Sequence, residues 1–262
     1  KVTGKTKTNL GIGFLNAIAN ETDQQPLSNF NIFTIDQSLA NNSFISITNT
    51  NVNRKKEGWA NVTGLTSSLK NKRNSYQLKS AFNFSLIDND QGDSKGFATN
   101  IDFSKISGKF QYYLGGNIES DTYDPNDMGF LYNNNEVSYF GGLSYKIDKP
   151  SKRLVEFRSE LNSYVSYLYA PYLFSTWEID ARQISTFKNY LTWGLTVELN
   201  PIETNDYFEA RSTINQLFKR SKYFVARTFF SSDYRKQVAL DVSFGGSRSP
   251  MYDEYGYFFR FS

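Results

Sequence analysis

Apolar side chains recur at every second residue over several long segments of the chain, and this period of two constrains the fold more than any other feature. Successive side chains of a β-strand point to opposite faces of a sheet. Each segment therefore predicts a strand with one apolar and one polar face. The segments run over residues 78–86, 110–118, 137–147, 155–169, 191–199 and 237–244.

Turn-forming residues separate these segments at a fairly even spacing, as at residues 148–151 and at Asn200-Pro201. Counting the alternating runs between such turns predicts about fourteen strands. No stretch with a helical period intervenes, so parallel strands linked by helices are not expected. The sequence therefore predicts an all-β fold of antiparallel strands.

Two residue types are missing, because the chain of 262 residues contains neither cysteine nor histidine. Disulfides, thiolate nucleophiles, imidazole bases and the usual zinc ligands are therefore excluded. The net charge is only +3, which does not give the basic footprint of a nucleic-acid-binding protein. We therefore expect a protein that is not an enzyme and that uses no cofactor, metal ion or nucleic-acid partner.

Aromatic residues make up 17% of the chain, although hydrophobic residues in total reach only 39%. A soluble β-sandwich core favours closely packed Val, Ile and Leu, whereas an outer-membrane barrel carries aromatic girdles on its lipid-facing side. The composition therefore favours an antiparallel transmembrane β-barrel. Ordinary cross-strand pairing of rings in a soluble β protein is the alternative. The residues expected to face lipid are Tyr139, Leu143, Trp193, Leu195, Leu240 and Val242.

Charged residues of both signs occupy the polar parity of the strands in the second half of the chain. They are Glu156, Arg158, Glu160, Glu178, Asp180, Arg182, Glu198, Glu209, Arg211 and Asp241. A charge inside a barrel needs a partner or water, so these residues predict a network of ion pairs along an interior wall. We expect Arg158 and Arg182 each to contact a carboxylate of an adjacent strand. A selectivity lining or a substrate path is the alternative.

Two carboxylates, Glu178 and Asp180, are spaced so that they share one face of a strand, at a separation compatible with glycoside hydrolysis. Because similar neighbours occur in almost any barrel, this spacing is a weak signal for an enzyme. A surface carbohydrate-active hydrolase, or a binding protein that uses inward or rim carboxylates, is the alternative function.

Residues 123–131, with the sequence Tyr-Asp-Pro-Asn-Asp-Met-Gly-Phe-Leu, resemble a segment of a large, functionally uncharacterised family of Bacteroidota outer-membrane β-barrels. Residues 1–6 and 11–17 are similar to the beginning of that barrel, and residues 94–98 and 107–110 to its middle portion. Members of the family usually carry a carbohydrate-binding-like β-sandwich of the family nine type ahead of the barrel. The candidate residues of the segment are Asp124, Asn126, Asp127, Gly129, Phe130 and Leu131.

The resemblance implies a barrel fold and a location in the bacterial outer membrane, and it carries over no catalytic residue. It implies outer-membrane lipid as a partner, together with other outer-membrane or surface proteins in a complex. We therefore expect a pore, a transport component or an accessory subunit of an envelope assembly. Because the sandwich domain is missing and the chain ends on Ser262, we expect residues 1–262 to be one barrel domain of a longer protein.

Residues 123–135 are predicted to form a loop between the strands 110–120 and 136–147. The loop is longer than the tight turns typical of the periplasmic side of a barrel, so we place it at the extracellular rim or folded into the mouth. Phe130 and Leu131 are expected to anchor the loop against the wall or to dock a partner.

Overall fold

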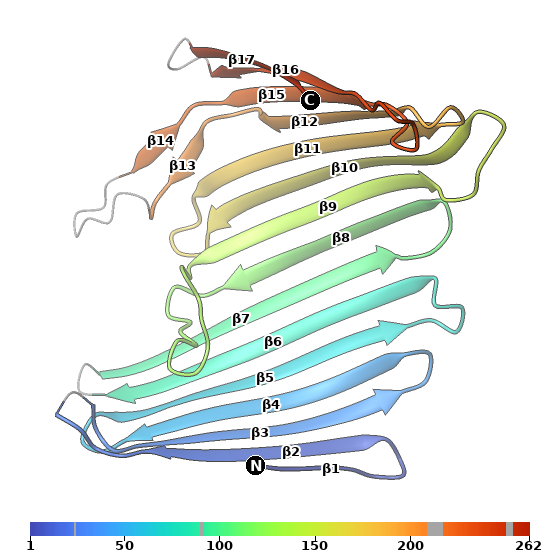
Figure 1. Ribbon diagram of the computed structural model, residues 1–262. Helices are drawn as coiled ribbons and strands as arrows, with labels where there is room; N and C mark the ends of the chain where they lie inside the picture. Colours follow the sequence, from blue (N-terminus) through green and yellow to red (C-terminus); the bar gives the residue numbers. More distant parts are fainter. Residues whose placement is uncertain (24, 90–91, 209–216, 250–253) are drawn as a thin grey trace. The chain divides into compact units, whose positions relative to one another are not determined.

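The computed structural model describes residues 1–23, 25–89, 92–208, 217–249 and 254–262 (Figure 1). These residues form seventeen strands. Within the described ranges no helix has the length and apolar character needed to cross a membrane. The strands are β1 (Val2–Lys5), β2 (Leu10–Ala19), β3 (Ser28–Leu39), β4 (Ser43–Arg54), β5 (Gly58–Lys70), β6 (Tyr76–Asn89), β7 (Gly92–Lys105), β8 (Phe110–Glu119), β9 (Glu136–Ile147), β10 (Leu154–Leu168), β11 (Phe174–Phe187), β12 (Thr192–Asn200), β13 (Thr204–Asp206), β14 (Phe218–Arg220), β15 (Tyr223–Ser231), β16 (Asp241–Ser249) and β17 (Glu254–Phe261).

Fifteen of the strands form one sheet, in which β1 to β12 follow one another in hydrogen-bonded order and β15, β16 and β17 continue it. β13 and β14 form a separate two-stranded sheet. Every strand pair with a described register is antiparallel. The prediction of an all-β fold of antiparallel strands is therefore confirmed.

The strands differ from the predicted ones in number, by one to three residues at most of their ends, and by more at β16. The additional strands include β1, β13 and β14, which have only three or four residues, too few for an alternation to be recognised. β16 begins at Asp241, so Leu240 lies before the strand and not within it as the alternation predicted. The backbone N–H of Leu240 donates to Ser232 Oγ at 2.7 Å, because residues 232–240 form the turn that leads into β16.

The chain divides into two compact units. Unit 1 comprises Lys1–Ile106, Gly115–Ser138 and Leu168–Leu173. It contains all of β1 to β7. Unit 2 consists of Ser107–Leu114, Tyr139–Tyr167 and Phe174–Ser262 and contains all of β11, β12 and β15 to β17.

The two ends of the strands in unit 1 have different connections. Residues 40–42 join β3 to β4 in a tight turn, where Asn41 and Asn42 have left-handed φ angles of 60° and 55°. Asparagine tolerates this conformation better than most residues do. At the opposite end, residues 20–27 join β2 to β3 and residues 120–135 join β8 to β9. We call this second end of unit 1 the loop end.

One face of the sheet in unit 1 collects the apolar parity of its strands. The register places Ile12, Ile35, Ile47, Leu65 and Phe82 directly opposite one another across β2 to β6. Most large side chains of this face are exposed and are not packed in a core. We call it the apolar face of unit 1.

The buried residues of unit 1 lie mainly on the opposite face, near the loop end. Val52 of β4 pairs with Ala60 of β5, and both are buried. Tyr123, from the connection between β8 and β9, is also buried. It packs on β7 at Gly96, where a Cβ atom would come within 2.3 Å of Tyr123 Cα. The core of unit 1 is therefore small and is covered by residues 120–135.

In unit 2 the same alternation separates a polar face from an apolar face. On the polar parity, Glu160 of β10 lies directly opposite Arg182 of β11. On the other parity, Trp193 of β12 pairs with Phe230 of β15, which in turn pairs with Val242 of β16. Each strand thus contributes both to the polar face of unit 2 and to its apolar face.

Candidate functional site

The polar face of unit 2 brings together eight of the ten charged residues identified in the sequence. Asp180 lies directly opposite Asn162 of β10 on one side and Glu198 of β12 on the other. The eight residues are Glu156, Arg158, Glu160, Glu178, Asp180, Arg182, Glu198 and Asp241. Glu209 and Arg211 lie outside the described residues.

Two ion pairs connect charged residues of this face. Arg158 Nη2 lies 2.6 Å from Glu160 Oε1, and the two residues share a face because they are two apart on one strand. Arg227 Nη1 of β15 lies 3.2 Å from Glu198 Oε1 of β12. The expectation that Arg158 contacts a carboxylate of an adjacent strand is therefore wrong, since its guanidinium reaches a carboxylate along its own strand.

Arg182 makes no ion pair with any carboxylate in the part of the chain that the structure describes, although Glu160 lies directly opposite it. The contact expected for Arg182 is therefore not observed, and the Glu160 carboxylate binds Arg158 instead. Arg227 was not among the predicted site residues, because its strand alternates poorly: Phe229 shares the parity of the arginine. The signal that could have identified Arg227 is a basic residue within the aromatic segment Tyr223–Ser231.

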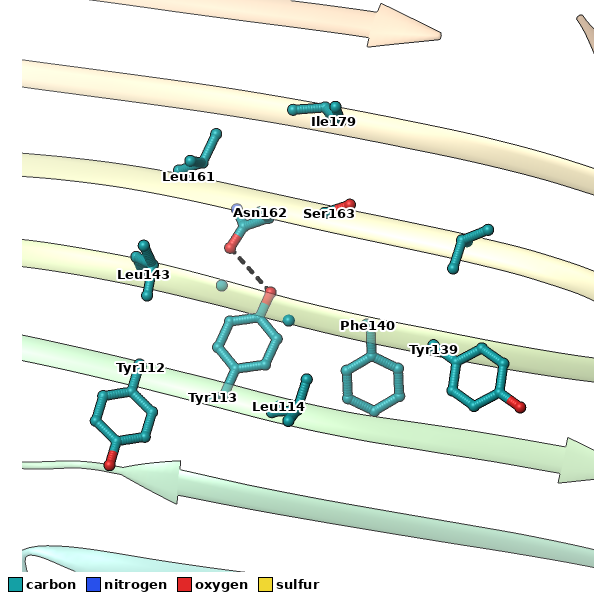
Figure 2. A pocket seen from close by; sticks show the side chains of 13 residues that line it. Tyr112, Tyr113, Leu114, Tyr139, Phe140, Leu143, Leu161, Asn162, Ser163 and Ile179 are labelled. Atoms are coloured by element: carbon teal, nitrogen blue, oxygen red, sulfur yellow. Dashed lines mark hydrogen bonds between the residues drawn. The ribbon is translucent and has the colours of Figure 1, made fainter. Parts of the chain in front are cut away.

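A line of hydrogen bonds crosses unit 2 on its polar face. Tyr113 Oη donates to Asn162 Oδ1 at 2.9 Å (Figure 2). Asn162 Nδ2 in turn donates to Asp180 Oδ2 at 2.8 Å. The Tyr113 ring lies over Gly142 of β9, where a Cβ atom would come within 2.4 Å of the ring. Gly142 thus provides the space in which the tyrosine reaches from β8 to β10.

A cavity of about 590 Å³ lies in the same region of unit 2 (Figure 2). Its lining includes the side chains of Leu114, Tyr139, Leu143 and Leu161. Tyr139 and Leu143 belong to the residues predicted to face lipid, and both are exposed. The lining suits an apolar group, because it offers few groups that would bind a charged ligand.

The paired carboxylates of Glu178 and Asp180 take part in the hydrogen bonds of the sheet. Asp180 accepts the bond from Asn162, and Glu178 Oε1 accepts one from Thr176 Oγ1 at 3.5 Å. No cluster of His, Cys, Asp or Glu side chains that could hold a metal ion occurs among the residues described. Glu178 and Asp180 are therefore part of a hydrogen-bonded polar face of the sheet.

The connection between β8 and β9 is held against the sheet of unit 1 by polar contacts. The backbone N–H of Asp124 donates to Ser85 Oγ at 3.2 Å. Asp127 forms an ion pair with Arg54 of β4 at 2.5 Å, and both side chains are half-buried. Residues 120–135 are therefore folded onto the sheet near the loop end.

Tyr123 lies at the centre of this contact. Burial raises the pKa of its phenol above the ordinary value of 10.0, and the charges of Glu119 and Asp124 act in the same direction. The side chain is therefore neutral at physiological pH and contributes as a packed ring.

The other candidate residues of this segment differ in their contacts and in their exposure to solvent. Asn126 Oδ1 accepts a hydrogen bond from the backbone N–H of Leu131 at 2.6 Å, which closes a turn. Gly129 lies against the carbonyl of Pro125. Phe130 is 85% exposed, so the expectation that it anchors the loop against the wall is wrong.

Fold and site together define an all-β protein whose sheet separates apolar from polar side chains. Over residues 1–262 the chain matches the family described as "Domain of unknown function (DUF5916)", and it belongs to this family. Comparisons with curated proteins and with solved structures give no match.

Proposed function

We propose that the chain forms the wall of an outer-membrane β-barrel, with its apolar faces against lipid and its polar faces against a water-filled interior. The barrel is not an enzyme and acts as a pore, a transport component or an accessory subunit of an envelope assembly. Its partners are membrane lipid and other outer-membrane or surface proteins. The similarity of residues 123–131 to Bacteroidota outer-membrane barrels supports this proposal.

The observation that carries the proposal is that the large apolar side chains are the exposed ones. On the apolar face of unit 1, Phe14, Phe33 and Ile47 are 45%, 40% and 44% exposed. Buried residues of the opposite face are short, such as Ser85 and Ala98. A soluble sheet buries its large apolar residues and exposes its polar ones, so this inverted distribution suits a lipid environment.

The height of the apolar face also fits a membrane. On β6 the apolar parity extends from Leu78 to Leu86. This distance is about 27 Å along a strand that rises ~3.4 Å per residue, or about 20 Å along the membrane normal at a tilt of ~40°. The apolar band of an outer-membrane barrel is ~25 Å tall. The apolar parity of β6 therefore comes close to the height of such a band.

The polar face of unit 2 supports a wet interior. Arg182 is exposed and makes no ion pair among the described residues, and Glu178 is also exposed. An unpaired charge is stable in contact with water but costly in a dry core. In unit 1, residues 120–135 are folded onto the polar side of the sheet, where they narrow the proposed interior.

An arginine at position 65 tests the proposal. Leu65 lies on the apolar face of unit 1, whereas its neighbour Thr66 lies on the other face between the uncharged Ser46 and Ala81. We expect Leu65→Arg to destabilise the chain in lipid vesicles by about 2–4 kcal/mol, because a guanidinium in hydrocarbon loses its water, and Thr66→Arg by much less. Urea titrations followed by tryptophan fluorescence measure the difference. Equal losses, or release of the wild-type chain by alkaline wash, would contradict the proposal.

A further inference from the structure

Seven asparagines gather on the apolar face of unit 1, toward the loop end. The register places Asn16, Asn31, Asn51 and Asn61 in one row across β2 to β5. The seven residues, which we call the amide belt, are Asn16, Asn29, Asn31, Asn49, Asn51, Asn53 and Asn61. Each of them continues the apolar parity of its strand, and none was among the predicted site residues.

Hydrogen bonds between the amides hold much of the amide belt in place. Asn16 Nδ2 donates to Asn29 Oδ1 at 2.6 Å and to Asn31 Oδ1 at 2.8 Å. Asn49 and Asn61 exchange two bonds of 3.0 Å and 3.2 Å between their side chains. A ligand therefore meets groups that are already oriented, which lowers the entropy lost on binding.

The side chains of the amide belt are uncharged, and they both donate and accept hydrogen bonds. Across β2 to β5, the three rows that contain these asparagines hold no charged residue, and they include Ile18 and Trp59. The nearest charge in these rows is Asp88 of β6, which accepts a hydrogen bond from Trp59 Nε1 at 2.9 Å. A primary amide offers two N–H donors and a carbonyl acceptor, so the amides keep bonding capacity beyond their mutual bonds. Sugars match this surface, because their hydroxyls both donate and accept and their C–H faces are apolar. Phosphate and carboxylate ligands favour Arg or Lys instead.

The amide belt directly continues the apolar face. On β3, Ile35 and Phe33 are followed on the same parity, toward the loop end, by Asn31 and Asn29. This inference rests on the proposed function, in which the apolar residues lie in the hydrocarbon layer. Longer barrel loops lie on the extracellular side. The amide belt then lies at the level of the lipid headgroups of the outer leaflet.

We propose that the amide belt binds the sugar headgroups of glycolipids in the outer leaflet. The occupant is a membrane glycolipid and not a free saccharide, because Phe14 and Phe33 form the row adjoining that of Asn16 and Asn31. One lipid molecule thus places its acyl chains on the phenylalanines and its sugars on the asparagines.

Trp59 lies directly opposite Asn53 of the amide belt, so its fluorescence reports on lipid bound at this surface. The chain contains 3 tryptophans, so the Trp177→Phe/Trp193→Phe double variant leaves Trp59 as the only one. This variant is placed in vesicles of phosphatidylcholine with brominated acyl chains, which quench tryptophan fluorescence on contact. Recovery of fluorescence on adding a second lipid then measures how well that lipid displaces the quencher from the surface around Trp59.

We expect digalactosyldiacylglycerol to displace the brominated lipid about fivefold better than unbrominated phosphatidylcholine does, which corresponds to about one net hydrogen bond. The further substitutions Asn31→Thr, Asn51→Thr and Asn61→Thr should remove this preference while keeping a good strand-forming residue at each position. Asn100→Thr, on the opposite face of the sheet, is the matched control and should keep it.

The outcomes separate this inference from the proposed function. Quenching without a glycolipid preference, or a preference that survives the three Asn→Thr substitutions, overturns the inference and leaves the lipid-facing wall intact. Equal recovery with deacylated digalactosylglycerol also overturns it, because the ligand would then be a free saccharide. Absence of any quenching by brominated lipid overturns both proposals.

Discussion

At the scale of single residues, charged side chains on the polar face of unit 2 interact along a strand as well as across strands. Arg158 and Glu160 form such a pair, and the arginine side chain is 59% exposed. Glu160 has a second guanidinium within reach, because Arg182 lies directly opposite on β11. An exposed pair with an alternative partner contributes little to stability.

Arg158→Ala should therefore lower the free energy of unfolding by less than about 1 kcal/mol, because Arg182 replaces the lost partner of Glu160. Removing both arginines should cost more than the sum of the single losses, by about 0.5 kcal/mol. A double-mutant cycle measured by urea denaturation in vesicles checks this coupling. Strictly additive losses would show that Arg182 does not interact with Glu160 in either background.

At the scale of elements, the connection between β8 and β9 is part of the folded structure of unit 1. Asp127 pairs with Arg54 of β4, and Tyr123 is buried on β7. Phe130 extends from the same connection into solvent. One end of the connection therefore stabilises the sheet, and its tip is available to a partner.

Tyr123→Ala should destabilise the protein by about 3 kcal/mol, since it removes a buried ring. The same change should speed hydrogen exchange of the backbone amides in residues 120–135. Phe130→Ala is the matched control and should leave stability and exchange unchanged, because its ring is exposed. Exchange followed by mass spectrometry measures both variants. Equal protection in the Tyr123 variant and the wild type would show that other contacts hold the connection.

At the scale of the whole molecule, the family assignment covers both units, and the proposed function makes a prediction about how the chain is oriented in a membrane. In unit 1 the longer connections are at the loop end, and tight turns such as residues 40–42 are at the other. Outer-membrane barrels place short turns in the periplasm and long loops outside the cell. The proposed orientation therefore exposes residues 120–135 on the cell surface.

Single cysteines test this orientation, because residues 1–262 contain none. Asn133→Cys, at an exposed position of the connection between β8 and β9, should react with a membrane-impermeant maleimide in intact cells. Ala40→Cys, at the exposed turn between β3 and β4, should react only after the outer membrane is permeabilised. The reverse pattern would mean that the chain is inserted the other way round.

Six of the fourteen strands with eight or more residues were predicted as alternating segments, because alternation is a local property of the chain. The segment 191–199 contains the apolar parity of β12 residue by residue. Short strands such as β13 have no room for a period, and the start of β16 was misplaced because the turn before it also contains apolar residues at alternate positions. The prediction of the fold was therefore limited where a strand is very short and where a turn contains alternating apolar residues.

The contacts of the candidate site were less predictable, because they depend on the register between strands. Periodicity placed Arg158 on the polar face, but only the folded chain shows that it pairs with Glu160 along its own strand. The charged partner of Glu198 came from β15, which sequence reasoning did not connect with β12.

The sequence by itself determined that this chain forms strands with one apolar and one polar side, since that pattern depends only on neighbouring residues. Only the tertiary structure decided which distant residues meet. Asn16, Asn31, Asn51 and Asn61 form one row because hairpin registers align them, and Tyr123 is buried because Gly96 leaves space on another strand. Register shifts of one residue would move each strand's side chains to the opposite face, so these contacts follow from pairing across the sheet and not from local pattern.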